Sequence, residues 1–482
     1  MSDILSLDAT GQIQALEGGR ISALEILDLT LARWKSQHNR INAVVETDLE
    51  RARARARSID ELRVKGESLG ALAGLPMTIK DTFDVAGLPA SSGLEALRRR
   101  TSVPDAGVVA RVRHEGAVIW GKSNVPVMAA DWQTYNGPYG TTANPWDTGR
   151  TCGGSSGGAA AALATGVTAL EIGSDIGGSL RVPASFCGVF SHKPTWGLVS
   201  QRGHIPPARG IQAERDLNVV GPMARSARDL RLLFSVLEGG PIAAKAPPQA
   251  LKDLRIGVWL SEGGFPLDPE VGGVVTGFAQ QIARCGASVE AVRPVDSAAL
   301  LGAYRVLLMS ALEADLPAAA RRSMRNLRGP AALARRLGAG PNSWAAQVLG
   351  YTATHAEWLA ADEVRARIGI QVRTVFEHYD VVLAPIAPVP PFPHDHRPFS
   401  RRALIQSDGA KIPYGSMLNW IALATACGLP ATAIPAGLSP GGLPVGVQLI
   451  GPRGGDGRTL AAAQAIEDEL GGFQAPPPLE AV

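Results

Sequence analysis

CGGSSGGAAAALATGVTALEIGSDIGGSLRVPASFCGVFSHKPT, residues 152–195, is the most informative stretch of this 482-residue chain. It places two serines in separate glycine-rich turns, Ser155 in GGSSGG and Ser179 in IGGS, with an alanine-rich segment of helical length between them. Glycine lets a backbone approach a bound molecule closely and turn its N–H groups toward one point. A hydroxyl in such a turn is therefore a candidate nucleophile beside a site for a negatively charged oxygen.

A serine nucleophile needs a base, and histidine is the residue that serves most often. None of the eight histidines stands in a pattern that marks it as the partner of either serine. Lys80, however, follows a short apolar run, Leu75–Ile79, which predicts a buried strand. Because burial lowers the pKa of a lysine, a neutral Lys80 can act as the base. The sequence thus predicts a relay in which Ser179 attacks, Ser155 bridges and Lys80 receives the proton.

Several motifs together resemble the amidase signature family, whose members cleave amide bonds with a serine, a second serine that follows a cis peptide bond, and a lysine. The matching segments are GLPMTIKD at 74–81, DAGVVARVRHEGAVIWGKSNVP at 105–126, NPWD at 144–147, the serine block at 152–195 and GLPVGVQLIGP at 442–452. They span most of residues 65–460, so the resemblance covers far more than one motif.

The resemblance implies a role for each candidate residue. Ser179 would form the acyl-enzyme, Ser155 would be the bridging serine, and Lys80 would be the base. Ser174 falls where the family carries a hydroxyl that hydrogen-bonds the lysine, so we expect it to support Lys80. The oxyanion hole would consist of the backbone N–H groups of Ile176, Gly177, Gly178 and Ser179. This chemistry needs no cofactor, and none is expected.

Short apolar runs alternate with helical patterns and glycine-rich turns from Gly70 onward. Four of these runs are Val118–Trp120, Leu254–Leu260, Val381–Pro385 and Val445–Ile450. Such alternation is typical of an α/β fold with helices on both faces of a central sheet. The resemblance implies a single amidase-signature domain with one mixed, many-stranded β-sheet.

A capping box, Ser22 with Glu25, precedes apolar residues at helical spacing, so we expect residues 1–66 to form an N-terminal helical arm. Residues 67–482 would form the amidase signature domain. Its expected parts are the core motifs at 70–240, a more variable helical insert at about 297–380 and a closing segment at 400–482. The segment GGPIAAKAPPQ at 239–249 has the composition of a linker.

The composition excludes several classes of protein. A net charge of +3 with 19% charged residues predicts neither nucleic acid nor a membrane as a partner. The N-terminus lacks a secretory pattern, and the longest apolar stretch, Gly157–Leu170, is too short to cross a bilayer. The four cysteines have no zinc or redox spacing, so we expect reduced thiols, no metal and a cytoplasmic location. The expected partner is a small-molecule amide, with a homodimer as an open alternative to a monomer.

Two further patterns suggest other chemistry. Residues 116–123, GAVIWGKS, match a phosphate-binding loop, but their middle positions are apolar and indicate a strand instead. The triplet His394-Asp395-His396 lies in a proline-rich loop without an evident further ligand, which favours a solvated loop over a metal site.

GGSSGG also satisfies the G-x-S-x-G pattern of α/β-hydrolases, with Ser156 as nucleophile and His192 or His204 as a candidate base. That pattern needs a strand immediately before it. The polar residues around Pro145 and Gly149 do not indicate one.

Two functions remain. The first is an amidohydrolase, with esterase activity as a side reaction, that prefers hydrophobic or aryl amides. The second is the glutaminase (A-type) component of a glutamine-dependent tRNA amidotransferase. The resemblance implies that such a component uses the same three residues and holds the glutamine amine with an aspartate. Leu418 occupies the corresponding position, counted from Gly428-Leu429-Pro430, and an apolar side chain cannot neutralise an ammonium group. We therefore predict that glutamine is the poorer substrate.

Overall fold

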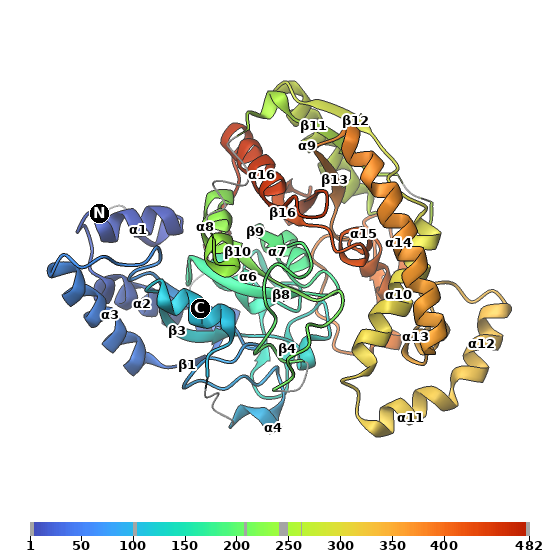
Figure 1. Ribbon diagram of the computed structural model, residues 1–482, viewed down its shortest axis with the longest axis horizontal. Helices are drawn as coiled ribbons and strands as arrows, with labels where there is room; N and C mark the ends of the chain where they lie inside the picture. Colours follow the sequence, from blue (N-terminus) through green and yellow to red (C-terminus); the bar gives the residue numbers. More distant parts are fainter. Residues whose placement is uncertain (1–3, 100–103, 207–209, 241–248, 262, 479–482) are drawn as a thin grey trace.

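The computed structural model describes residues 4–99, 104–206, 210–240, 249–261 and 263–478 (Figure 1). Its centre is an eight-stranded sheet in the order β12-β11-β13-β17-β16-β9-β10-β8. These strands are β8 (Leu170–Asp175), β9 (Phe190–Lys193), β10 (Val219–Ala224), β11 (Arg255–Val258), β12 (Ser288–Ala291), β13 (Val381–Pro385), β16 (Ala431–Leu438) and β17 (Pro444–Ile450). β11 runs parallel to β12 and β13, whereas the other neighbours are antiparallel, so the predicted mixed sheet is confirmed.

The central strands are apolar on both faces. In β13, Val382 and Ala384 join the apolar cluster on one side of the sheet, whereas Val381 and Leu383 join the cluster on the other. Side chains alternate along a strand, so a strand covered on both faces appears in the sequence as a continuous apolar run. This explains why the runs at 381–385 and 445–450 could be recognised without any alternation of polar residues.

Helices cover both faces of the sheet, as predicted. One face packs against α8 (Ala227–Glu238), α9 (Pro269–Arg284) and α16 (Asp456–Leu470). The other packs against α6 (Gly157–Ala164), α7 (Arg181–Cys187), α10 (Ser297–Glu313), α14 (His355–His378) and α15 (Ala422–Ala426). Every residue of α6 is buried, because its glycines and alanines allow close approach by neighbouring segments.

A smaller sheet in the order β1-β3-β2 lies beside β8, and it contains β1 (Val44–Thr47), β2 (Pro76–Lys80) and β3 (Val118–Ser123). The apolar runs Leu75–Ile79 and Val118–Trp120, which the sequence analysis expected in the central sheet, therefore belong largely to this smaller sheet. The segment at 116–123 that resembles a phosphate loop lies largely in β3. Lys80 is the last residue of β2, and this position turns its side chain toward β8.

The N-terminal segment contains α1 (Ala9–Glu17), α2 (Ala23–Ile41) and α3 (Leu49–Val64), and Ser22 with Glu25 forms the capping box of α2. It also contributes β1, which pairs with β3 and so ties this segment to the rest of the chain. At the opposite end of the molecule, the segment at 297–380 contains α10, α11 (Ala318–Asn326), α12 (Arg328–Arg336), α13 (Trp344–Tyr351) and α14. α11 and α12 project away from the central sheet (Figure 1).

The remaining elements are short. They are α4 (Glu95–Arg98), α5 (Gly107–His114), β4 (Tyr135–Asn136), β5 (Gly140–Thr141), β6 (Ala143–Asn144), β7 (Asp147–Thr151), β14 (Ala403–Ile405) and β15 (Lys411–Pro413). Residues 241–248 of the predicted linker lie outside the described residues. No helix within the described ranges combines the length and the apolar character needed to cross a membrane.

Candidate active site

Lys80 lies at the centre of a group of hydroxyls. Its Nζ is 2.8 Å from Ser155 Oγ, 2.8 Å from Ser156 Oγ and 2.9 Å from Ser174 Oγ. The Lys80 side chain is fully buried. The structure thus brings together three residues that the sequence singled out, Lys80, Ser155 and Ser174, and adds Ser156, which the sequence analysis considered only as a hydrolase nucleophile.

The loop around Ser155 depends on glycine. The Gly154–Ser155 peptide bond is cis, as the resemblance implies. Gly153 has φ +83°, and a Cβ there would lie 2.7 Å from Pro183 Cα, so a larger residue would force the loop off α7. Contrary to expectation, a short strand, β7, precedes this loop. Its polar residues pair with β6 in a hairpin, and such backbone pairing leaves no apolar signal in the sequence.

Ser179 lies just before α7, at the junction of two cavities. A small cavity of about 30 Å³ is lined by Ser155, Ser174, Ser179 and His204. Ser179 also lines a larger pocket of about 350 Å³. The loops of the two serines are joined by a hydrogen bond of 3.2 Å from the Ser156 N–H to the Ser179 carbonyl.

The loop before Ser179 is held by side chains on both sides. Tyr304 Oη donates to the Ile176 carbonyl at 3.0 Å, and Trp132 Nε1 donates to the Gly177 carbonyl at 2.8 Å. The Gly178 N–H was expected to be one of the oxyanion donors. It instead donates to Asp175 Oδ1 at 2.9 Å, so it is not available to a substrate oxygen. Within the described residues, the N–H groups of Ile176, Gly177 and Ser179 have no hydrogen-bond partner.

Sequence reasoning did not identify Tyr304 as a support of this loop, because Tyr304 belongs to α10, which is distant in the sequence. By holding the Ile176 carbonyl, it turns the N–H of the same peptide unit, that of Gly177, to the opposite side.

We expect Tyr304→Phe to lower kcat about 3- to 10-fold, the equivalent of ~1 kcal/mol, with little change in KM. Steady-state kinetics on an amide substrate test this, and an effect confined to KM would contradict it.

Burial sets the charge states around Lys80. It lowers the pKa of Lys80 to about 7, although the Asp175 and Glu171 carboxylates partly oppose the shift. Burial also works against ionisation of Asp175, but the ion pair with Arg181 at 3.0 Å prevails and lowers the pKa of Asp175 to about 2. A lysine with a pKa near 7 is substantially neutral at physiological pH, which is the state that a base requires.

The pocket beside Ser179 is largely apolar. Its walls include Trp132, Leu308, Met309, Leu312, Phe399 and Leu418. Asp131 also lines it, but its carboxylate accepts hydrogen bonds from Tyr414 Oη at 2.7 Å and from Arg402. Arg305 donates to the Pro341 carbonyl and to Asn342 Oδ1, and no carboxylate partner for it is found among the described residues.

Apart from His204, which lines the small cavity, the other candidates lie elsewhere. His192 contacts Thr432 Oγ1 at 2.9 Å and Asp456 Oδ1 at 3.1 Å, away from Ser156. In the triplet at 394–396, Asp395 is paired with Arg397 at 2.7 Å and His396 stacks on Tyr135 with ring centroids 3.9 Å apart.

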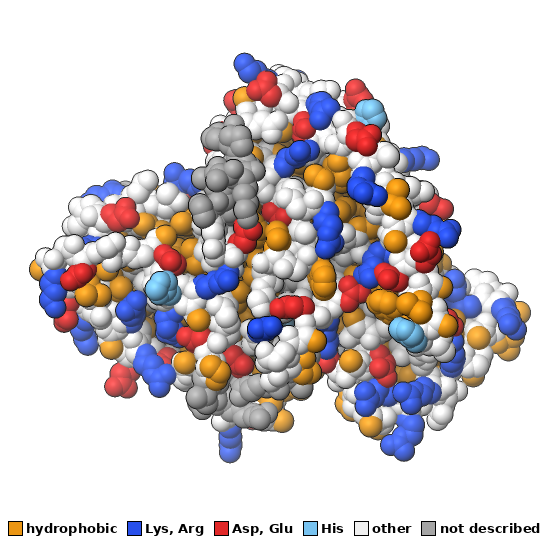
Figure 2. Space-filling view, viewed as in Figure 1, with side chains coloured by type: hydrophobic (Ala, Val, Ile, Leu, Met, Phe, Trp, Pro, Cys, Tyr) orange, Lys and Arg blue, Asp and Glu red, His pale blue; other side chains and the backbone are white. Residues whose placement is uncertain are grey.

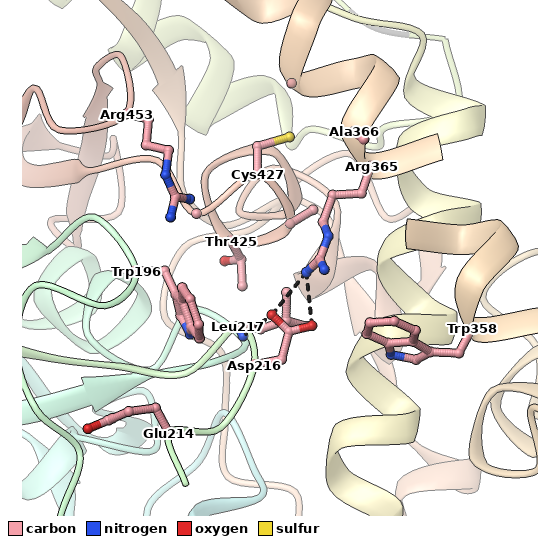
Figure 3. A pocket seen from close by; sticks show the side chains of 13 residues that line it. Trp196, Glu214, Asp216, Leu217, Trp358, Arg365, Ala366, Thr425, Cys427 and Arg453 are labelled. Carbon is pink, nitrogen blue, oxygen red and sulfur yellow. Dashed lines mark hydrogen bonds and ion pairs between the residues drawn. The ribbon is translucent and has the colours of Figure 1, made fainter. Parts of the chain in front are cut away.

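A further cavity of about 520 Å³ lies between α14 and the loops around 196, 216 and 427 (Figure 3). Trp196 and Trp358 lie on either side of the ion pair between Arg365 Nη1 and Asp216, at 2.9 Å. Neither Lys80 nor any of the serines around it lines this cavity. We therefore place the candidate active site at Ser179 and not in this larger cavity.

Comparisons with known proteins identify the family. The sequence model of the family described as Amidase matches residues 25–460. The chain belongs to the amidase signature family. This amidase is similar to a solved structure titled "Crystal structure of amidase", with 29% identity, a TM-score of 0.80 and coverage of 96% of this chain and 100% of the other. It is also similar to a bacterial aryl acylamidase, with 25% identity, a TM-score of 0.80 and 96% coverage of both chains.

Among curated proteins, the amidase is 33% identical to the A-type component of the glutamyl-tRNA(Gln) amidotransferase of Synechococcus sp. (strain CC9605), with 96% of each chain covered. The name of these relatives refers to a tRNA, which contradicts the prediction from the sequence that nucleic acid is not a partner. That prediction rested on net charge, which averages over local concentrations of charge. Residues 318–336 carry six arginines and no carboxylate, and Figure 2 shows Lys and Arg side chains gathered over α11.

Proposed function

We propose that this enzyme hydrolyses amides through an acyl-enzyme on Ser179. Ser179 Oγ attacks the amide carbonyl while its proton passes to Ser155 Oγ, and the Ser155 proton passes to Lys80 Nζ. The protonated lysine returns a proton through Ser155 to the leaving amine when the C–N bond breaks. Water then attacks the ester, and the same relay accepts and returns its proton, which releases the carboxylic acid and free Ser179.

The observation that carries this proposal is the 2.8 Å contact between buried Lys80 Nζ and Ser155 Oγ. Ser155 and Ser179 line the same small cavity, and the N–H groups of Ile176, Gly177 and Ser179 are unpartnered within the described chain. Such donors stabilise the negative oxygen that forms when the carbonyl is attacked. Base, bridge, nucleophile and oxyanion donors are therefore available on neighbouring segments.

We propose further that the acyl group is hydrophobic or aromatic. Leu308, Met309 and Leu418 supply apolar walls next to Ser179, and the pocket volume of about 350 Å³ suits a small ring. Leu418 is 5% exposed and presents no charge to a substrate ammonium group. The similarity to an aryl acylamidase supports this substrate class.

A second candidate is the A-type component of a glutamyl-tRNA(Gln) amidotransferase. The curated relatives favour it more strongly than they favour a free-standing amidase. One feature of the pocket also favours it, because Arg305 presents a guanidinium that could hold the carboxylate of glutamine. In this case, ammonia released at Ser179 would serve a reaction on tRNA that involves other protein components.

A substrate comparison separates the two candidates. We expect kcat/KM for aryl-acetamide or benzamide substrates to exceed that for glutamine by over tenfold, since burial of one ring contributes roughly 2 kcal/mol. Arg305→Met should leave the aryl amides largely unaffected and reduce any use of glutamine. Equal or better turnover of glutamine, particularly when the other amidotransferase components are added, would favour the second candidate.

A further inference from the structure

His204 contacts the catalytic group through one hydroxyl. Its Nε2 lies 2.8 Å from Ser174 Oγ, and its Nδ1 lies 2.6 Å from the carbonyl oxygen of Pro206. The ring is buried, and it forms a T-shaped contact with the Phe83 ring, with centroids 5.0 Å apart. The sequence offered His204 only as a candidate base for Ser156, and no local pattern indicated its contact with Ser174, which spans 30 residues.

The two contacts define the tautomer. A carbonyl oxygen can only accept, so Nδ1 must carry the proton that is donated to Pro206. Burial, together with the charge of Lys80, lowers the pKa of His204 to about 3, so the ring is neutral at physiological pH. Nε2 then carries no proton and must accept, which requires the Ser174 hydroxyl to donate to His204.

This direction determines the hydrogen bonds of Lys80. Ser174 Oγ has given its only proton to His204, so it accepts from Lys80 Nζ. Ser156 Oγ donates to the Ser174 carbonyl at 3.5 Å, so it too accepts from Lys80. A neutral amine has two N–H bonds and one lone pair. With both N–H bonds engaged, the lone pair is left for the third contact, the Ser155 hydroxyl at 2.8 Å.

We propose that His204 is a positioning residue of the relay, which keeps Ser174 an acceptor and so directs the lone pair of Lys80 at the Ser155 proton. The inference rests on the proposed function, because it assumes that Lys80 is the base. Without His204, the Ser174 hydroxyl is free to turn and donate to Lys80, where it competes with Ser155 for the lone pair.

The test is a pair of substitutions that separate the two contacts of the ring. His204→Asn keeps a donor for the Pro206 carbonyl but has no atom near Ser174, and we expect kcat to fall roughly 10- to 100-fold. A hydrogen bond donated to the amine favours its neutral form, so the acidic limb of the pH profile should move to lower pH. His204→Gln retains an amide oxygen within reach of Ser174 and should keep more of the activity than His204→Asn.

A double-mutant cycle with Ser174→Ala then distinguishes positioning from a general structural role. If His204 acts through Ser174, adding His204→Asn to Ser174→Ala should cause almost no further loss of kcat. Ser92→Ala is the matched control, because Ser92 Oγ holds the same loop by donating to the Ile205 carbonyl at 3.2 Å without touching Lys80. Its effect should add to that of Ser174→Ala.

Additive losses for His204→Asn and Ser174→Ala, or equal losses for His204→Asn and His204→Gln, would overturn the role of His204. The same series includes Lys80→Met. If Lys80→Met retains full activity, the proposed function itself fails. If Lys80→Met is inactive while the cycle is additive, only the inference about His204 fails.

Discussion

Ser179→Ala is expected to abolish turnover, with kcat lower by roughly 10⁶-fold, the order of magnitude lost when a serine nucleophile is removed. The reason is that Ser179 Oγ forms the covalent bond in the proposed mechanism. No other hydroxyl belongs to residues 176–179, whose Ile176 and Gly177 N–H groups have no partner among the described residues. The variant should also fail to react with a serine-directed fluorophosphonate, measured by intact-protein mass spectrometry.

Ser155→Ala is the control for this experiment. Ser155 passes protons but is not acylated, so its loss should reduce kcat strongly while leaving slow labelling at Ser179. Full labelling of Ser179→Ala would show that another residue is the nucleophile. Labelling of Ser156 in the wild-type protein would instead revive the hydrolase interpretation.

Lys80→Met is expected to reduce activity roughly 10²- to 10⁴-fold at neutral pH, the range that a general base contributes. The pKa of Lys80 is lowered to about 7 by burial, so the wild-type rate should fall as the pH decreases through this value and Lys80 gains a proton. In the variant this acidic limb should disappear, and the loss should be smaller at strongly alkaline pH, where hydroxide partly replaces the base. Rate profiles of kcat/KM against pH measure both effects.

Lys193 offers a matched control. It is also fully buried, and burial lowers its pKa to about 7 as well. Its Nζ donates to the carbonyl oxygens of Pro194 and Leu429 and to neither catalytic serine. Lys193→Met should therefore keep the acidic limb in place. If Lys193→Met removes the limb and Lys80→Met does not, the base has been assigned to the wrong lysine.

The sequence by itself determined the family and the type of fold. The glycine-rich serine turns and the apolar run before Lys80 are local patterns. These patterns and their spacing can be recognised in the sequence without knowing any tertiary contact. The strands at 381–385 and 445–450 were likewise predictable, because burial on both faces leaves a continuous apolar run. Strand β7 was missed, since its residues are polar and its pairing with β6 is made by backbone groups.

Only the tertiary structure decided which groups surround the candidate catalytic residues. Tyr304 reaches the Ile176 carbonyl from 128 residues away, and the Gly178 N–H is engaged by Asp175 instead of facing a substrate. The sequence offered His204 only as a candidate base for Ser156, whereas the fold places its Nε2 against Ser174. Hydrogen-bond partners of this kind depend on how distant strands, helices and loops pack. Local sequence patterns record the conformation of a segment but not the side chains that the fold brings against it.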